Sequence, residues 1–344
     1  MSLLVAIIVL AVVFDFINGF HDAANSIATV VSTRVLTPLQ GVLWAAAFNF
    51  IAFFIAKFII GGFGIADTVS KTVLAEYVTL PIILCGLVAA IIWNILTWRL
   101  GIPSSSSHAL IGGFAGSAIA AVGLESIHWG VVGFIAAFII AAPLIGMIGG
   151  LVITAIILWL VRGIKPRFAD VLFKRLQLVS SAMLSIGHGL NDSQKVMGII
   201  AAALISFTTS AGETAPEWLR LSNISDMPDW VAVICFTAIA LGTMAGGWRI
   251  MKTMGSRITR LNPLEGFCSQ MSGALTLFLT ELVHVPVSTT HVISGSIMGV
   301  GALDRLSAVR WGVTVQLLWA WVLTIPVSAA LGMGVSFLFS LFYA

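Results

Sequence analysis

Long apolar stretches separated by short polar turns form the main pattern of this sequence. The stretches lie at about residues 3–31, 41–60, 78–97, 131–161, 178–205, 230–245, 266–281 and 313–342. A helix of roughly twenty apolar residues crosses the hydrocarbon core of a membrane. The pattern therefore predicts an all-α polytopic membrane protein, with about 10–12 membrane segments once broken helices and re-entrant hairpins are included.

The composition leads to the same class of protein. Hydrophobic residues make up 59% of the 344 residues and charged residues only 9%, whereas soluble domains carry about 25% charged residues. The first apolar stretch has neither a basic start nor a small-residue cleavage site, so we interpret it as a mature membrane helix and not as a signal peptide. The protein is expected to cross the cytoplasmic membrane many times.

Two polar motifs interrupt the apolar pattern, and each of them occurs twice. The hydroxyl motif, GIPSSSSHALIGGFAG at residues 101–116, recurs as VPVSTTHVISGSIMG at residues 285–299, with its proline and histidine 183 positions further on. The carboxylate motif, NGFHDAANS at residues 18–26, recurs as HGLNDSQK at residues 188–195, with its aspartate 170 positions further on. The chain is therefore an internal duplication.

The charged loops predict how the two halves lie in the membrane. Residues 162–177 form a basic linker and residues 249–260 a basic loop, which places both in the cytoplasm, whereas the acidic loop at 213–229 is placed outside. Tracing the crossings backwards then inverts residues 1–161, the first repeat, relative to residues 178–344, the second. Inverted repeats with interrupted helices are typical of secondary transporters, which bind substrate where the repeats meet.

Each hydroxyl motif has the pattern of a helix start. A proline precedes a run of Ser or Thr, and small helix-compatible residues follow. The free N–H groups and partial positive charge of a helix N-terminus, with added hydroxyls, suit a small oxyanion. The alternative is local bonding to the helix backbone or helix packing, which the duplication disfavours. The candidate anion ligands are Ser105, Ser106, Ser107, Ser288, Thr289 and Thr290.

Asp22 and Asp192 lie inside apolar stretches, where a bare charge costs at least about 2.5–3.5 kcal/mol. Each therefore needs a cation or a proton, unless both belong to a buried polar network that only fixes helix packing. Neutral oxygen ligands beside them suit a hard cation or a proton relay. These neighbours are Asn18, Asn25, Ser26 and Asn191. Lys195, three residues after Asp192, would reach it on a helix, either as a local ion pair or as a substrate contact.

His108 and His291 occupy equivalent positions in the two hydroxyl motifs. Their paired placement favours a role in proton coupling or in orienting the site, although a lone histidine in a helix is more often a satisfied core residue. Asp15 lies one helical turn before Asn18. It either joins the carboxylate network or caps an extracellular helix end.

The sequences FDFINGFHDAANSIATVV, WNILTWRLGIPSSSSHALIGG, SIGHGLNDSQKVMGI and VPVSTTHVISGS together resemble the paired signatures of the inorganic phosphate transporter (PiT) family, closest to its bacterial low-affinity Pit branch. The resemblance implies an inverted-repeat carrier, a homodimer in the lipid bilayer, that moves inorganic phosphate with a coupling cation and needs no cofactor or nucleic acid. By the family pattern, the six hydroxyls would hold phosphate. The residues that would hold ions and close the site are Asp22, Asn25, Asn191 and Asp192.

Three positions depart from the sodium-coupled members of that family. Asn49 and Gln270 stand where those members carry glutamates, and Lys195 stands where an asparagine is usual. The Pit branch resembles proton symporters that accept phosphate as a neutral metal complex, so we predict coupling to protons or transport of a metal phosphate. Sodium coupling is the alternative, with sodium or Mg²⁺ bound with phosphate at Asp22 and Asp192.

Two function classes compete with a carrier. A phosphate or other anion channel would use the same motifs, and cation-dependent, saturable flux distinguishes a carrier from it. An intramembrane aspartyl protease would use Asp22 and Asp192 as a catalytic dyad. Neither aspartate has the Gly-x-Gly-Asp setting of such proteases, and the duplicated hydroxyl motifs would serve no purpose. We therefore expect a transporter and not an enzyme.

Overall fold

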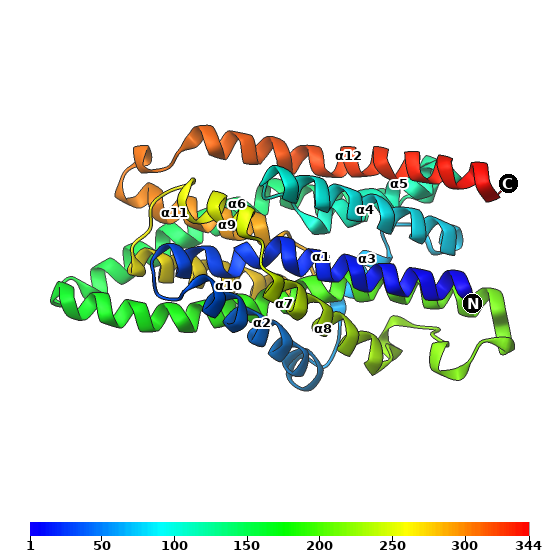
Figure 1. Cartoon of the computed structure of the whole chain (residues 1–344), viewed down its shortest axis with the longest axis horizontal. Coiled ribbons are helices and arrows are strands. Elements are labelled where there is room, and N and C mark those ends of the chain that lie inside the picture. The colour runs from blue at the N-terminus through cyan, green and yellow to red at the C-terminus, as the bar shows by residue number, and fades with distance from the viewer. Residues whose placement is uncertain (344) are drawn as a thin grey trace.

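The computed structural model describes residues 1–343, and these form an elongated bundle of helices with both termini at one end (Figure 1). Within them no β-strand forms beyond one isolated bridge between Val73 and Ile127. The α-helices are α1 (Ser2–Ser32), α2 (Pro38–Ile55), α3 (Gly64–Ser70), α4 (Leu80–Leu100), α5 (Ser106–Ala121), α6 (Trp129–Val161), α7 (Pro166–Ala211), α8 (Asp229–Ala245), α9 (Trp248–Ser256), α10 (Pro263–Leu282), α11 (Thr289–Asp304) and α12 (Trp311–Tyr343).

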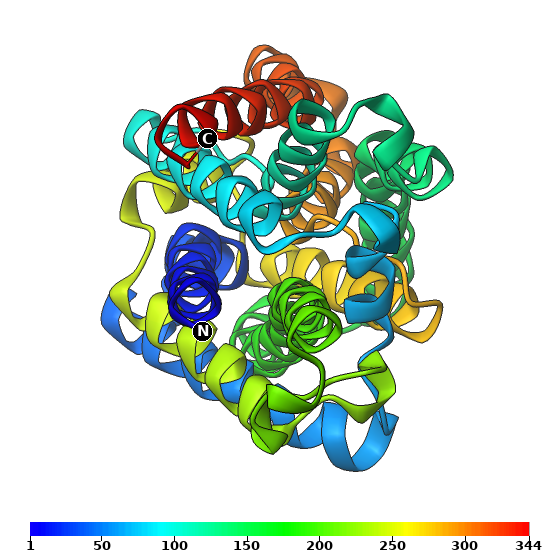
Figure 2. The same ribbon diagram turned by 90° about the vertical axis from the view of Figure 1, so that its right-hand side faces the viewer.

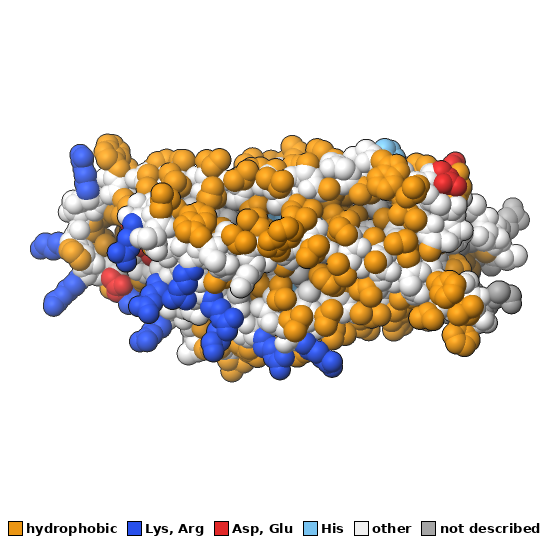
Figure 3. All heavy atoms as spheres, turned by 90° about the horizontal axis from the view of Figure 1, so that it is seen from above, with side chains coloured by type: hydrophobic (Ala, Val, Ile, Leu, Met, Phe, Trp, Pro, Cys, Tyr) orange, Lys and Arg blue, Asp and Glu red, His pale blue; other side chains and the backbone are white. Residues whose placement is uncertain are grey.

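Several helices are long and apolar enough to cross a membrane, which confirms the predicted class. Six meet this criterion on their own, and α8 with α9, bent by 74° at a short break, makes a seventh. Apolar side chains cover most of the surface in Figure 3, while Lys and Arg gather at the end opposite the termini. The six helices are α1, α2 with its extension to Ile60, α4, α6, α7 and α12.

The helices α5 and α11, of 16 residues each, lie inside this bundle. Every residue of α5 from Ser106 to Ala118 and of α11 from Thr289 to Gly301 is buried. These helices are largely free of lipid contact, so small and polar residues are tolerated along their whole circumference. The predicted polar motifs therefore belong to the interior of the protein and not to its surface.

The packing of the helices reflects the duplication. α5 packs on α12 and α11 packs on α6, while α1 packs on α8 and α7 on α2; Figure 2 shows α12 beside α5. A side chain at Gly116 would collide with the carbonyl of Ala329, and one at Gly299 with that of Met147. Small residues let membrane helices touch through their backbones, and the two glycines are 183 positions apart. The inverted orientation and the boundaries of the halves stay predictions.

Two local features differ from the sequence-based picture. The polar motif at residues 18–26 interrupts the apolar pattern but does not break the helix, because α1 is continuous from Ser2 to Ser32. The polar side chains there pair with other helices and leave the helical backbone bonds intact. Much of the predicted basic linker is helical, since α7 begins at Pro166 and runs for 46 residues, about 70 Å at 1.5 Å per residue. The first turns of α7 therefore extend beyond the hydrocarbon layer.

Candidate functional site

Both hydroxyl motifs begin a helix, as their sequence predicts. The Ser105 hydroxyl accepts the backbone N–H of His108 (3.2 Å) at the start of α5, and the Ser288 hydroxyl accepts that of His291 (3.4 Å) at the start of α11. These are N-cap bonds, which satisfy one free N–H of each helix. Each cap leaves its hydroxyl hydrogen available, so the serine is a cap and still a potential donor to a ligand.

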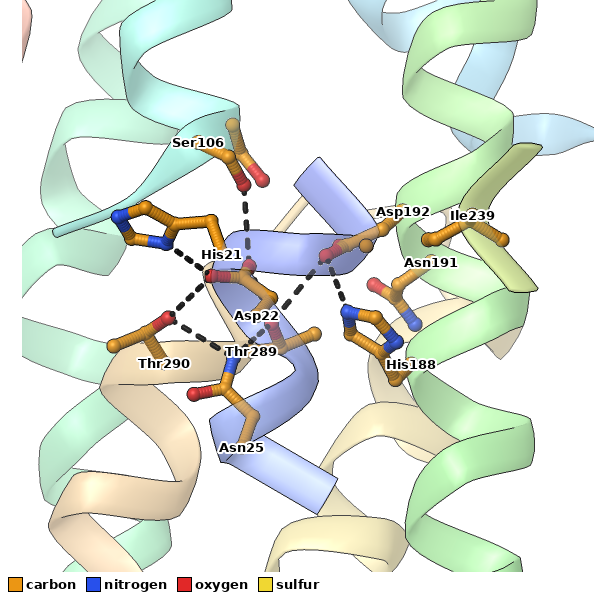
Figure 4. A network of polar contacts seen from close by, with 12 residues as sticks. His21, Asp22, Asn25, Ser106, His188, Asn191, Asp192, Ile239, Thr289 and Thr290 are labelled. Carbon is orange, nitrogen blue, oxygen red and sulfur yellow. Dashed lines mark hydrogen bonds and ion pairs between the residues drawn. The ribbon is translucent and has the colours of Figure 1, made fainter. Parts of the chain in front are cut away.

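Asp22, on α1, lies between the two helix starts (Figure 4). Its carboxylate accepts hydrogen bonds from the hydroxyls of Ser106 (3.2 Å), Thr290 (3.4 Å) and Thr289 (3.5 Å). His21 Nδ1 lies 2.8 Å from the same carboxylate. The side chain is 2% exposed. The structure thus brings the first carboxylate motif together with both hydroxyl motifs.

Asp192, on α7, faces the same point from the opposite side. Its carboxylate is paired with Lys195 (2.5 Å) and lies 3.1 Å from His188 Nε2. The Thr289 hydroxyl is 3.4 Å from Asp192 and 3.5 Å from Asp22. Because one hydroxyl hydrogen makes one strong bond at a time, Thr289 can switch between the two carboxylates.

Two side chains reach from the carboxylate motifs across to the hydroxyl motif of the other half. Asn25 Nδ2 donates to Thr289 (3.1 Å) and Thr290 (3.0 Å). Lys195 Nζ donates to the Ser107 hydroxyl (2.7 Å) and to the Val287 carbonyl (2.6 Å). The Lys195 ammonium therefore contacts both Asp192 and the Ser107 hydroxyl. A local ion pair and a contact with the substrate do not exclude each other.

Asp22, His188 and Asp192 form a group that could hold a cation. One ligand atom from each lies within 4.8 Å of the others, and all three residues are buried. His188 is not among the ligands predicted from the sequence. Its position four residues before Asp192 on one helix was the available signal, because residues at this spacing share a helix face. Carboxylate and imidazole together accept protons or divalent metals.

The predicted ion ligands Asn18, Ser26 and Asn191 lie on the same two helices but do not bond to Asp22 or Asp192 in the described chain, and their side-chain oxygens are free. Asn191 Nδ2 donates to the carbonyls of Gly187 and Leu277, both at 3.3 Å. Buried polar atoms are normally satisfied by protein, water or an ion. The buried oxygens without a protein partner include those of Asp15, Asn18, Asn25, Ser26 and Asn191.

His108 and His291 are brought together but not to the aspartates. Their ring centroids lie 5.0 Å apart, and the His291 ring lies 4.3 Å from that of Trp321. Both residues are fully buried. Within the described chain their ring nitrogens have no hydrogen-bond partner. Their role in proton coupling stays a prediction.

Asn49 and Gln270, the two neutral positions, are engaged by protein groups. Asn49 Nδ2 donates to Thr243 (2.8 Å), and its Oδ1 lies 3.2 Å from His188 Nδ1. Gln270 accepts from Ser180 (3.1 Å) and donates to the Ser26 carbonyl (3.2 Å). Both amides therefore act as structural links, and Asn49 orients the histidine beside Asp192.

The site is closed to solvent in this conformation. Its six hydroxyl residues are at most 5% exposed. A cavity of about 920 Å³ lies elsewhere, between the 67–81 segment and the 202–224 segment, and shares no residue with the site. A ligand would therefore need helix movement to enter the site.

Comparisons with known proteins agree with this arrangement. A probable low-affinity inorganic phosphate transporter of Rhizobium meliloti (strain 1021) is 48% identical over 328 residues, or 95% of this chain and 93% of the relative. A protein of the same description from Bacillus subtilis (strain 168) is 42% identical over 335 residues, or 96% of this chain and 95% of the relative.

The fold is also found among solved structures. One described as "The sodium-dependent phosphate transporter" matches with a TM-score of 0.84 and 25% identity, covering 99% of this chain and 100% of that chain. A sequence model described as "Phosphate transporter family" matches residues 18–332, which include all four motifs. Because this match spans most of the chain, the protein belongs to the phosphate transporter family.

Proposed function

We propose that this protein is a secondary active symporter that imports inorganic phosphate across the cytoplasmic membrane together with protons, or as a neutral metal phosphate. The observation that carries the proposal is the meeting of two hydroxyl-bearing helix N-termini at one buried carboxylate, Asp22. Helix N-termini and hydroxyls bind a phosphate group. Because the Asp22 carboxylate is also negatively charged, a cation must bind together with the phosphate.

Coupling follows from competition for the same donors. Ser106 and Thr290 donate to Asp22 in the structure described here. When phosphate enters, these hydroxyls turn to its oxygens, and Asp22 loses two of its hydrogen bonds beside a new negative charge. A buried carboxylate with fewer partners is more costly. Phosphate therefore binds only when a proton or another cation neutralises Asp22. Phosphate and the cation are then transported together.

The neutral side chains at Asn49 and Gln270 support protons over sodium. Their amide groups already bond to Thr243 and Ser180, so neither adds a negative charge for a metal ion. Sodium is the second candidate, because the matching solved structure is of a protein described as sodium-dependent and the Asp22, His188 and Asp192 group could hold a cation. A divalent metal would enter as part of the cargo.

Selectivity for phosphate over sulfate has a simple physical basis in this site. Phosphate keeps a proton at neutral pH, and its P–OH group donates to a carboxylate such as Asp22. Sulfate has no proton to donate and is repelled by the same carboxylate. Arsenate, with the same hydrogen-bonding pattern as phosphate, should compete far better than sulfate does. Equal competition by sulfate would contradict this account.

The geometry does not favour the aspartyl protease. Its two aspartates must share a proton, so one of them needs a raised pKa. Asp192 is instead paired with the Lys195 ammonium at 2.5 Å, which stabilises its charged form.

Uptake of radiolabelled phosphate into liposomes tests the proposal. Purified protein is reconstituted, proton and sodium gradients are imposed independently, and magnesium is present or absent. Saturable uptake that follows the proton gradient and ignores sodium is the expected result. Strict sodium dependence would support the second candidate, and unsaturable flux without any gradient dependence would indicate a channel. Mass measurement of the detergent-solubilised protein tests the homodimer, which we propose by family resemblance.

A further inference from the structure

The two carboxylate motifs differ at one equivalent position. Asn25 in the first motif aligns with Lys195 in the second, three residues after the aspartate in both cases. The duplication has thus kept the aspartate on both sides and placed a neutral amide on one side and an ammonium on the other. The two halves of the site therefore match at the aspartate and differ in charge three residues later.

The contacts of these two residues are reciprocal. Asn25 donates to Thr290 and Lys195 donates to Ser107, and these two hydroxyls are 183 positions apart, so they are themselves equivalent. Each hydroxyl accepts from the residue of the opposite half, so its own hydrogen remains a donor, which Thr290 directs to Asp22 in this structure. Such a polarised O–H is a better donor to an anion than an isolated hydroxyl.

The charge on Lys195 has no counterpart elsewhere inside the protein. It is 2% exposed and is the only buried lysine or arginine among the described residues. Its three bonds, to Asp192, Ser107 and the Val287 carbonyl, use all three ammonium hydrogens. The second half of the site therefore carries its own cation, which the first half lacks.

We propose that Lys195 is a tethered cation of the phosphate site, which replaces one of the cations that would otherwise have to enter with each phosphate. It offsets the charge of Asp192 permanently, so that only Asp22 must be neutralised by a mobile cation. The inference rests on the phosphate symport proposed above. Because the lysine stays attached to the protein, it contributes positive charge to binding and carries none across the membrane.

The test compares variants that change the charge and the geometry separately. Lys195→Asn copies the residue at the equivalent position of the first half. Lys195→Arg keeps the charge, and the double variant Asp192→Asn with Lys195→Asn removes both charges together. Lys57→Asn is the matched control, since Lys57 is a partly exposed lysine paired with Asp229 at 2.6 Å.

Two measurements on purified protein give the answer. The first is equilibrium binding of radiolabelled inorganic phosphate in choline and in sodium buffers, and the second is the charge moved per phosphate in liposomes. Lys195→Asn should lose at least about tenfold in phosphate affinity in choline, and added sodium or lower pH should restore it. Its charge per phosphate should rise by about one elementary charge, as expected for one more mobile cation.

The other variants define the outcome that overturns the proposal. Lys57→Asn, which lies outside the site, should bind phosphate in choline as the wild type does. Lys195→Arg and the double variant change the site itself, so only their charge moved per phosphate, and not their phosphate affinity, should match the wild type. The proposal is wrong if Lys195→Asn keeps the wild-type charge per phosphate and cation dependence. It is also wrong if the double variant becomes as cation-dependent as Lys195→Asn, which would show a geometric role. If Lys195→Asn does not fold, Lys195→Gln, which removes the same charge with a longer side chain, takes its place.

Failure of the inference is distinguishable from failure of the proposed function. If the wild type neither binds nor transports phosphate, the proposed function is wrong. If the wild type transports phosphate and the Lys195 variants leave its coupling unchanged, only the tethered cation is wrong.

Discussion

Asp22 and Asp192 occupy equivalent positions in the two halves, yet their surroundings differ in kind. Asp22 is held mainly by hydroxyls that a phosphate would also use, from Ser106 and Thr290. Asp192 is held by Lys195 and His188, which belong to its own helix. Asp192 is therefore the fixed side of the site, because it is held in an ion pair with Lys195. Asp22 is the responsive side, because phosphate binding would remove some of its hydrogen bonds.

The largest expected effect comes from the fixed side. Asp192→Asn leaves the Lys195 ammonium buried without its partner, and breaking a buried ion pair in this way costs about 3–5 kcal/mol. We expect a large drop in the melting temperature of the purified protein in detergent. Asp22→Asn, which strands no cation, is the control and should melt close to the wild type. Equal melting temperatures for both variants would contradict the contrast between the two sides.

The responsive side should affect coupling more than stability. Asp22→Asn still accepts hydrogen bonds from the hydroxyls but cannot bind a proton or a cation. Concentrative phosphate uptake should fall at least about a hundredfold, equivalent to about 2.7 kcal/mol, while exchange of internal for external phosphate continues. Uptake and counterflow in the same liposomes measure the two separately. Gradient-driven uptake by this variant would place the coupling acid elsewhere.

The local features of the site could be predicted from the sequence, but the difference between the surroundings of Asp22 and Asp192 could not. Apolar run lengths predicted the membrane class, and the proline followed by hydroxyls predicted the starts of α5 and α11, because these features are local. The burial of aspartates in apolar stretches correctly indicated a need for partners. Spacing on one helix was sufficient to place Lys195 beside Asp192.

The partners from the opposite half could not be predicted in the same way. Asn25 meets Thr290 across 265 positions of sequence, and Lys195 meets Ser107 across 88 positions. Such contacts depend on how α5 and α11 enter the bundle, which no local pattern specifies. The continuity of α1 through Asp22 has the same origin, because bonds to other helices remove the need for a break.

A smaller effect is expected where the halves touch through glycine. Gly116→Ala and Gly299→Ala would each push a methyl group into the backbone of α12 or α6, and overpacking of this kind costs about 1–3 kcal/mol. Gly133→Ala is the control, because nothing lies within 4 Å of its added carbon. Thermal melting should show two similar losses and no loss in the control. A loss in only one of the pair would show that the duplicated contacts differ in importance.

The smallest effect separates capping from phosphate binding. Ser105→Ala and Ser288→Ala each remove an N-cap, which costs about 1 kcal/mol, and they also remove a hydroxyl donor. Ser105→Asn and Ser288→Asn keep an acceptor for the backbone N–H of His108 or His291 but lack the hydroxyl. Melting temperature should recover in the Asn variants, because capping needs only the acceptor, whereas the KM for phosphate should stay raised if the hydroxyl contacts the anion. If the KM recovers along with the melting temperature, Ser105 and Ser288 act only as helix caps. Phosphate would then be bound by Ser106, Ser107, Thr289 and Thr290. If the KM recovers in only one of the two Asn variants, the helix starts of α5 and α11 differ in function, as Asp22 and Asp192 do.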